Sequence, residues 1–170
     1  TEVRDLLRQA TEARQYTLVL RLQRVLLYDP AVGEPDKAKI MANLLSENSL
    51  PYASAAILEL IVDEALKRGQ QDLAVKAAQT MIDDFTETDA ALSARMLLAR
   101  IAADEGDYAI AVGHLTIVRE VFASSPEAAE ALMQLGDIHF KHREFDEADE
   151  AYNDILGVKE WRSLWPAALY

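Results

Sequence analysis

Apolar residues recur along this chain at spacings of three and four, with polar residues between them. The pattern is clearest in residues 129–156, where one apolar set includes Leu132 and Leu135 and a second includes Ala148 and Tyr152. Such spacings place the apolar side chains on one face of an α-helix. A lone helix would leave that face in water, so we expect the two segments to pack on each other and on neighbouring helices.

The rest of the chain follows the same pattern, and no segment alternates apolar and polar residues like a half-buried strand. None of the five prolines lies within an apolar segment, as expected if the segments are helices. Pro51 and Pro126 are predicted to open helices, with Ser125 as an N-cap and further caps in the polar run 86–89. The sequence therefore predicts about nine helices, near residues 2–13, 16–28, 36–46, 51–68, 72–85, 90–104, 108–123, 126–142 and 145–156.

Three predicted turns follow one another at intervals of 37 residues, at Gly69, Gly106 and Arg143. An alanine stands five residues after each of them, at Ala74, Ala111 and Ala148. Gly33 and Ala38 show the same offset at an interval of 36, which predicts a degenerate fourth pair near the N-terminus. Recurrence at one interval is typical of stacked helix pairs, each of which buries its apolar face against the next.

This repeat resembles that of the tetratricopeptide repeat family, whose helix pairs carry W-x2-L-G-x2-Y and then A-x3-F. The best copy has these residues at signature positions: Leu132, Leu135, Gly136, His139, Ala148 and Tyr152. The interval of 37 is longer than the family's usual period of about 34, and the signature tryptophan is missing from every copy. The resemblance implies an all-α fold, a right-handed superhelical solenoid of antiparallel helix pairs, in which small residues allow two helices to approach closely.

The length of 170 residues suits one ordinary domain, so we expect a single domain over residues 1–170 that is built from these repeats. Its expected parts are degenerate helices in 1–50, repeats in 51–87, 88–124 and 125–158, and a linker with the start of a further helix in 159–170. One interval after residue 129 falls at Pro166, where a further first helix would open. Either this segment is a terminal cap or the chain is part of a longer repeat array, and we favour the longer array. Trp161 and Trp165 flank this start. Either they cover the end of the stack or they form an aromatic anchor for a peptide.

The charge of the chain narrows the range of partners. Its 29 acidic and 17 basic residues give a formal net charge of −12, whereas nucleic acids and anionic membranes bind basic surfaces. We therefore expect neither nucleic acid nor membrane as a partner. The chain has no cysteine, which excludes disulfides and thiolate chemistry, and no apolar run of the roughly 18–20 residues that span a bilayer. These features predict a soluble protein, cytoplasmic or periplasmic.

Residues that could support catalysis or metal binding are few. No glycine-rich phosphate loop or G-x-S-x-G motif is present, and the acidic run 144–150 lacks the ligand spacing of an EF-hand. His139 and His142 have a ligand-capable spacing that Asp137 or Glu144 could complete, although a metal site usually needs further convergent ligands. We favour the interpretation that His139 replaces the signature tyrosine between paired helices and that His142 is solvated. We expect no enzyme activity, no catalytic site, no cofactor and no metal.

In the tetratricopeptide repeat family the first helix of each pair lines a concave groove, and the resemblance carries this role to eight positions. They are Glu59, Asp63, Met96, Arg100, Glu130, Met133, Asp137 and Phe140. The set is acidic with adaptable apolar groups, which suits a basic, partly apolar segment. We therefore expect a non-catalytic scaffold for protein–protein interaction, with an acidic groove for a peptide or protein. The alternative is a structural repeat segment that packs against further repeats or self-associates through exposed repeat ends.

Overall fold

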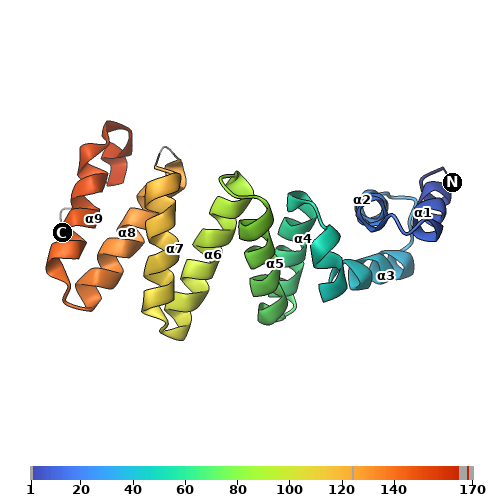
Figure 1. Ribbon diagram of the computed structural model, residues 1–170, viewed down its shortest axis with the longest axis horizontal. Coiled ribbons are helices and arrows are strands. Elements are labelled where there is room, and N and C mark those ends of the chain that lie inside the picture. Colours follow the sequence, from blue (N-terminus) through green and yellow to red (C-terminus); the bar gives the residue numbers. More distant parts are fainter. Residues whose placement is uncertain (1, 124, 165–167, 169–170) are drawn as a thin grey trace. The chain divides into compact units, whose positions relative to one another are not determined.

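The computed structural model describes residues 2–123, 125–164 and 168, and it divides into two compact units, residues 1–86 and 87–170 (Figure 1). Unit 1 contains α1 (Glu2–Glu12), α2 (Tyr16–Leu27), α3 (Glu34–Leu44), the 3-10 helix η1 (Glu47–Tyr52), α4 (Ala55–Lys67) and α5 (Gln71–Asp84). Unit 2 contains α6 (Asp89–Glu105), α7 (Tyr108–Val121), α8 (Pro126–Lys141), α9 (Phe145–Gly157) and the 3-10 helix η2 (Lys159–Leu164). The described residues contain no strand, so the all-α prediction is confirmed. The right-handed superhelix remains a prediction.

Four turns between successive helices share one backbone geometry. Arg14, Gly69, Gly106 and Arg143 all have positive φ, from 54° at Arg14 to 86° at Gly106. The amide of the following residue donates to a carbonyl five positions back, with N···O distances from 2.8 to 3.0 Å. This is the Schellman arrangement, which satisfies carbonyls left unbonded at a helix C-terminus. The prediction that Gly69, Gly106 and Arg143 occupy corresponding bends is confirmed.

Two predicted boundaries in unit 1 were wrong. Gly33 has a φ of −69° and precedes α3 as its N-cap, so it is not an equivalent of the other turns, and the N-terminal hairpin closes at Arg14 instead. Pro51 lies inside η1 and does not open α4, which begins at Ala55 behind Ser54. A 3-10 helix bonds residues three apart, so a proline within it avoids the carbonyl four positions back with which it clashes in an α-helix interior.

Small residues let the two helices of a pair approach closely, as predicted. Ala74, Ala111 and Ala148 near the starts of α5, α7 and α9 are exposed by 0%, 0% and 2%. Gly136 also allows a close contact, because the ring of Tyr152 from α9 packs directly over its position on α8. The repeated alanines and Gly136 therefore mark the contacts between paired helices.

Larger side chains fill the remaining space in unit 2, where α6 to α9 lie side by side (Figure 1). Leu115, Val118 and Ile155 are fully buried at the centre of this core. The N-termini of two of these helices are capped as predicted. Thr88 Oγ1 accepts from the Ala91 amide at 3.3 Å, and Ser125 Oγ accepts from the Ala128 amide at 3.2 Å.

Candidate binding groove

A groove of about 270 Å³ lies between α6 and α8, the first helices of the two pairs in unit 2. It is lined from α6 by Ser93, Met96, Leu97 and Arg100, and from α8 by Glu127, Glu130 and Gln134. These positions recur at three- and four-residue spacings, so they form one stripe on each helix. The opposite stripes of the same helices carry the buried core residues.

The charges of this groove are two carboxylates and one guanidinium. Glu130 Oε1 accepts from Gln134 Nε2 at 3.1 Å, one turn further along α8. Arg100 and Glu127 are exposed, and neither forms an ion pair with any side chain that the structure describes. Since Met96 and Leu97 are half-buried beside them, the groove combines an apolar floor with acidic edges.

The structure brings three of the eight predicted groove residues together, namely Met96, Arg100 and Glu130. Met133 is half-buried against the core of unit 2. Phe140 is 59% exposed at the end of α8, where its ring packs edge-on against Phe145 with centroids 5.7 Å apart. Glu59 and Asp63 belong to unit 1, where both are exposed on α4.

Sequence reasoning missed Glu127 and Gln134 as groove residues. They lie three residues before and four residues after Glu130 on the same helix. That helical spacing was a usable signal, because residues three and four apart share one face.

Asp137 has a partner within its own helix pair. Tyr152 Oη donates to Asp137 Oδ1 at 2.9 Å, which joins α9 to α8. Burial of the phenol, together with its hydrogen bond to Asp137 and the nearby negative charge, raises the pKa of Tyr152 to about 12. Asp137 is nevertheless exposed.

We expect Tyr152 to ionise well above the ordinary range of a tyrosine. Its pKa is about 12, against an ordinary value of 10.0. The folded state therefore holds this proton more tightly than the unfolded state, and its contribution to stability is complete below pH 10 and lost as pH rises towards 12. Ultraviolet absorbance of tyrosinate during a pH titration measures this. Tyr152→Phe should remove a tyrosinate step near pH 12, and Asp137→Asn should lower the midpoint of that step. A titration curve that Tyr152→Phe leaves unchanged near pH 12 would contradict the assignment.

Two of the chain's three histidines have contacts near the α8–α9 turn. His139 Nδ1 lies 2.7 Å from Glu144 Oε2 across the α8–α9 turn. His142 is exposed, and its ring packs edge-on against Tyr108 with centroids 4.4 Å apart. No group of three or more His, Asp or Glu side chains suited to a metal ion occurs in the described part of the chain.

Trp161 packs against the core of unit 2 and is half-buried. It adjoins a cleft with Arg119, whose guanidinium bonds Glu150 at 2.7 Å and Asp154 at 2.6 Å. This placement supports the interpretation that Trp161 covers the end of the core. Trp165 and Pro166 lie outside the described residues.

The model of one protein family matches this chain. Its description is Tetratricopeptide repeat, and it matches residues 60–116 and 96–163, which include all of α5 to α9. No curated protein matches the chain. Each helix in the described residues is too short or too polar to cross a lipid bilayer.

Proposed function

Since this chain belongs to the tetratricopeptide repeat family, we propose that it is a non-catalytic scaffold whose groove between α6 and α8 holds a basic, partly apolar segment of another protein. Repeats of this family generally mediate protein–protein interaction. The observation that carries the proposal is the groove itself, with Glu127 and Glu130 along one side and Met96 and Leu97 at its floor.

Each group in the groove suits a different part of such a segment. Glu127 and Glu130 attract lysine or arginine, although an exposed ion pair contributes only about 0.2–1 kcal/mol. The carboxylates therefore contribute more to specificity for a basic partner than to the affinity for it. Met96 adapts its shape to an apolar side chain, and Arg100 donates to backbone carbonyls or to a carboxylate of the bound segment.

The remaining predicted residues lie outside this groove, three on α8 of unit 2 and two on α4 of unit 1. Met133, Asp137 and Phe140 continue along α8, and Glu59 and Asp63 occupy on α4 the repeat positions that Met96 and Arg100 occupy on α6. We propose that a longer partner segment also contacts the three residues of α8, and that Glu59 and Asp63 contact a partner segment within unit 1.

Selection from a displayed library of random heptapeptides tests the groove. The full chain should enrich peptides that carry lysine or arginine beside apolar residues. Synthetic copies should bind Glu127→Lys/Glu130→Lys at least about tenfold more weakly, and their affinity for the unchanged chain should fall with salt.

The matched control is Asp104→Lys/Glu120→Lys, which makes the same change of charge at two exposed acids of unit 2 outside the groove. Its affinity should stay close to that of the unchanged chain. An equal loss of peptide affinity in both variants, or a selection that yields no basic peptides, would show that the groove is not the binding site.

A further inference from the structure

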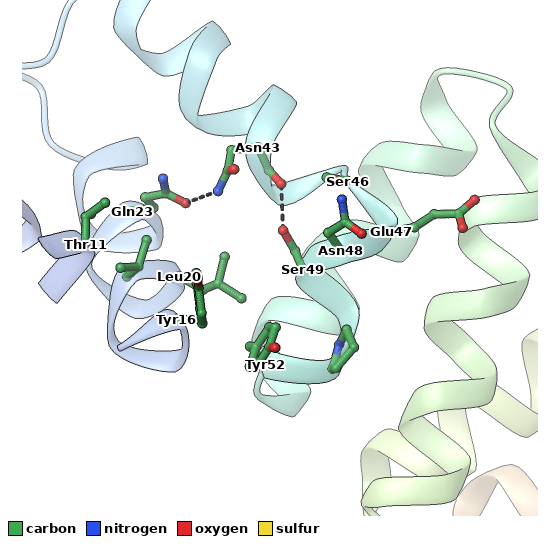
Figure 2. Close-up of a pocket in the computed structure, with 12 residues that line it drawn as sticks. Thr11, Tyr16, Leu20, Gln23, Asn43, Ser46, Glu47, Asn48, Ser49 and Tyr52 are labelled. Carbon is green, nitrogen blue, oxygen red and sulfur yellow. Dashed lines mark hydrogen bonds between the residues drawn. The ribbon is translucent and has the colours of Figure 1, made fainter. Parts of the chain in front are cut away.

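Unit 1 departs from the repeat between its two hairpins, and the departure leaves a cavity. α1 pairs with α2 and α4 pairs with α5, but α3 is followed by the short η1 in place of a second helix. A cavity of about 640 Å³ opens between α2, the end of α3 and η1 (Figure 2). Its volume falls within the roughly 300–1,000 Å³ typical of ligand pockets.

Two side-chain amides meet in this cavity. Asn43 Nδ2 donates to Gln23 Oε1 at 2.7 Å, and Ser49 Oγ holds α3 to η1 by donating to the Asn43 carbonyl at 2.7 Å (Figure 2). The described hydrogen bonds leave the NH2 group of Gln23 and the side-chain oxygen of Asn43 without a protein partner. If the oxygen and nitrogen positions of both side-chain amides are exchanged, one NH2 group and one oxygen are still left without a protein partner. A donor beside an acceptor matches the carbonyl and the amide of a peptide backbone.

The described lining of the cavity carries no unpaired charge. Glu47 is its one ionisable acid or base other than tyrosine, and its carboxylate points away towards α5 (Figure 2). There, Lys76 Nζ donates to Glu47 Oε1 at 2.7 Å. Because a charge placed in such a site would lose solvation without gaining a partner, the cavity suits an uncharged part of a ligand.

A second hollow of about 480 Å³ shares a tyrosine pair with the first. Tyr16 and Tyr52 line both hollows, and their ring centroids are 5.0 Å apart. Arg14 and Arg21 line the second hollow, and neither forms an ion pair with a side chain that the structure describes. α2 itself contains no acidic residue. In a chain of net charge −12, this is a local site for a carboxylate.

From the two hollows together we propose a docking site for an extended peptide segment in which a carboxylate lies next to an uncharged stretch. The backbone of the uncharged stretch bonds Gln23 and Asn43. An apolar side chain lies on the rings of Tyr16 and Tyr52, which are 49% and 43% exposed. These rings can bury apolar area against it while their hydroxyl groups stay in contact with water. The carboxylate binds Arg14 and Arg21. This site lies wholly in unit 1 and takes the opposite charge from the groove of unit 2, so neither proposal depends on the other.

The experiment uses the full chain and a displayed library of random heptapeptides, followed by calorimetry with synthetic copies of the enriched peptides. Arg14→Gly/Arg21→Gln removes both cations, and glycine accepts the φ of 54° at residue 14 without strain. Gln23→Leu/Asn43→Leu replaces both amides by apolar groups of similar size, which can leave stability nearly unchanged. Circular dichroism confirms that each variant is folded.

We expect the library to yield acidic peptides that Arg14→Gly/Arg21→Gln binds about ten- to a hundredfold more weakly, as for lost hydrogen bonds to charged groups. Replacing the aspartate or glutamate of the peptide by its amide should cause a similar loss. Gln23→Leu/Asn43→Leu should bind the acidic peptides about two- to tenfold more weakly for each lost hydrogen bond between neutral groups. The matched control Arg4→Gln/Arg8→Gln removes two exposed cations from α1 and should bind normally. Glu127→Lys/Glu130→Lys should also bind these acidic peptides normally.

Three outcomes overturn the proposal. The first is a selection that returns only basic peptides or none. The second is a set of acidic peptides that bind Arg14→Gly/Arg21→Gln and the α1 control equally well. The third is binding that survives Gln23→Leu/Asn43→Leu unchanged. If the selection yields only basic peptides, and only Glu127→Lys/Glu130→Lys weakens their binding, the result would support the groove of unit 2 and contradict the site proposed in unit 1.

Discussion

Replacing Leu115 by alanine is expected to lower the free energy of unfolding of unit 2 by about 2–5 kcal/mol. Leu115 is 0% exposed and lies in the core that also contains Leu92, Leu132 and Ile155. The substitution removes buried methyl groups and leaves a cavity, because the helices around it are already held in contact and relax only partly. Since whole domains are stable by only about 5–15 kcal/mol, this change would leave unit 2 marginal.

Tryptophan fluorescence during urea unfolding measures this effect in unit 2, since both tryptophans of the chain, Trp161 and Trp165, belong to residues 87–170. Ile110→Ala is the matched control on the same helix, because Ile110 is 55% exposed. The control should change stability by no more than about 0.5 kcal/mol. Equal shifts of the midpoint in the two variants would show that Leu115 is not a core residue.

Gly136→Ala is expected to destabilise unit 2 by about 1–3 kcal/mol. In an exposed helix interior the same change stabilises by up to about 1 kcal/mol, because alanine has the higher helix propensity. The sign reverses here because the added methyl would overlap the ring of Tyr152, 2.6 Å from Cδ1. The ring would have to move, and its hydrogen bond to the Asp137 carboxylate would be lost with its packing.

Gly113→Ala provides the control for helix propensity alone. Gly113 is exposed in the middle of α7, and a methyl added there meets nothing within 4 Å, so this variant should be more stable than the unchanged chain. In a Tyr152→Ala background, Gly136→Ala should become neutral or stabilising, since the two residues interact directly. If Gly136→Ala stabilised the unchanged chain as Gly113→Ala does, the close contact of α8 with α9 would be disproved.

The helices could be predicted because their apolar residues recur at spacings of three and four. Three of the turns could be predicted because Gly69, Gly106 and Arg143 follow one another at intervals of 37 residues. The turn at Arg14 could not, because it stands 55 residues before Gly69 instead of 37, and Val19 stands where the other copies have alanine. Its hydrogen bond from Gln15 to Ala10, at 2.9 Å, is nevertheless the same as in the other turns. The backbone geometry is conserved between the copies, whereas the residue types that would reveal it are not.

The groove was predicted in part for a similar reason. Met96, Arg100 and Glu130 follow from the register of the repeat, and spacing alone would have added Glu127 and Gln134. Contacts such as Tyr152 with Asp137 depend on side-chain rotamers across two helices, which periodicity does not encode. The cavity of unit 1 was missed because it arises where the repeat fails, at η1.

The shared turn geometry also bears on how the chain reaches its native state. Each of the four hairpins is closed by a hydrogen bond between residues five apart, so little chain entropy is lost in forming it. Contacts between neighbours in sequence give a low contact order, and helical proteins of this kind fold in roughly microseconds to milliseconds. Nucleation can therefore begin in any hairpin, and during synthesis the one closed at Arg14 can form on the ribosome before its successors have been translated.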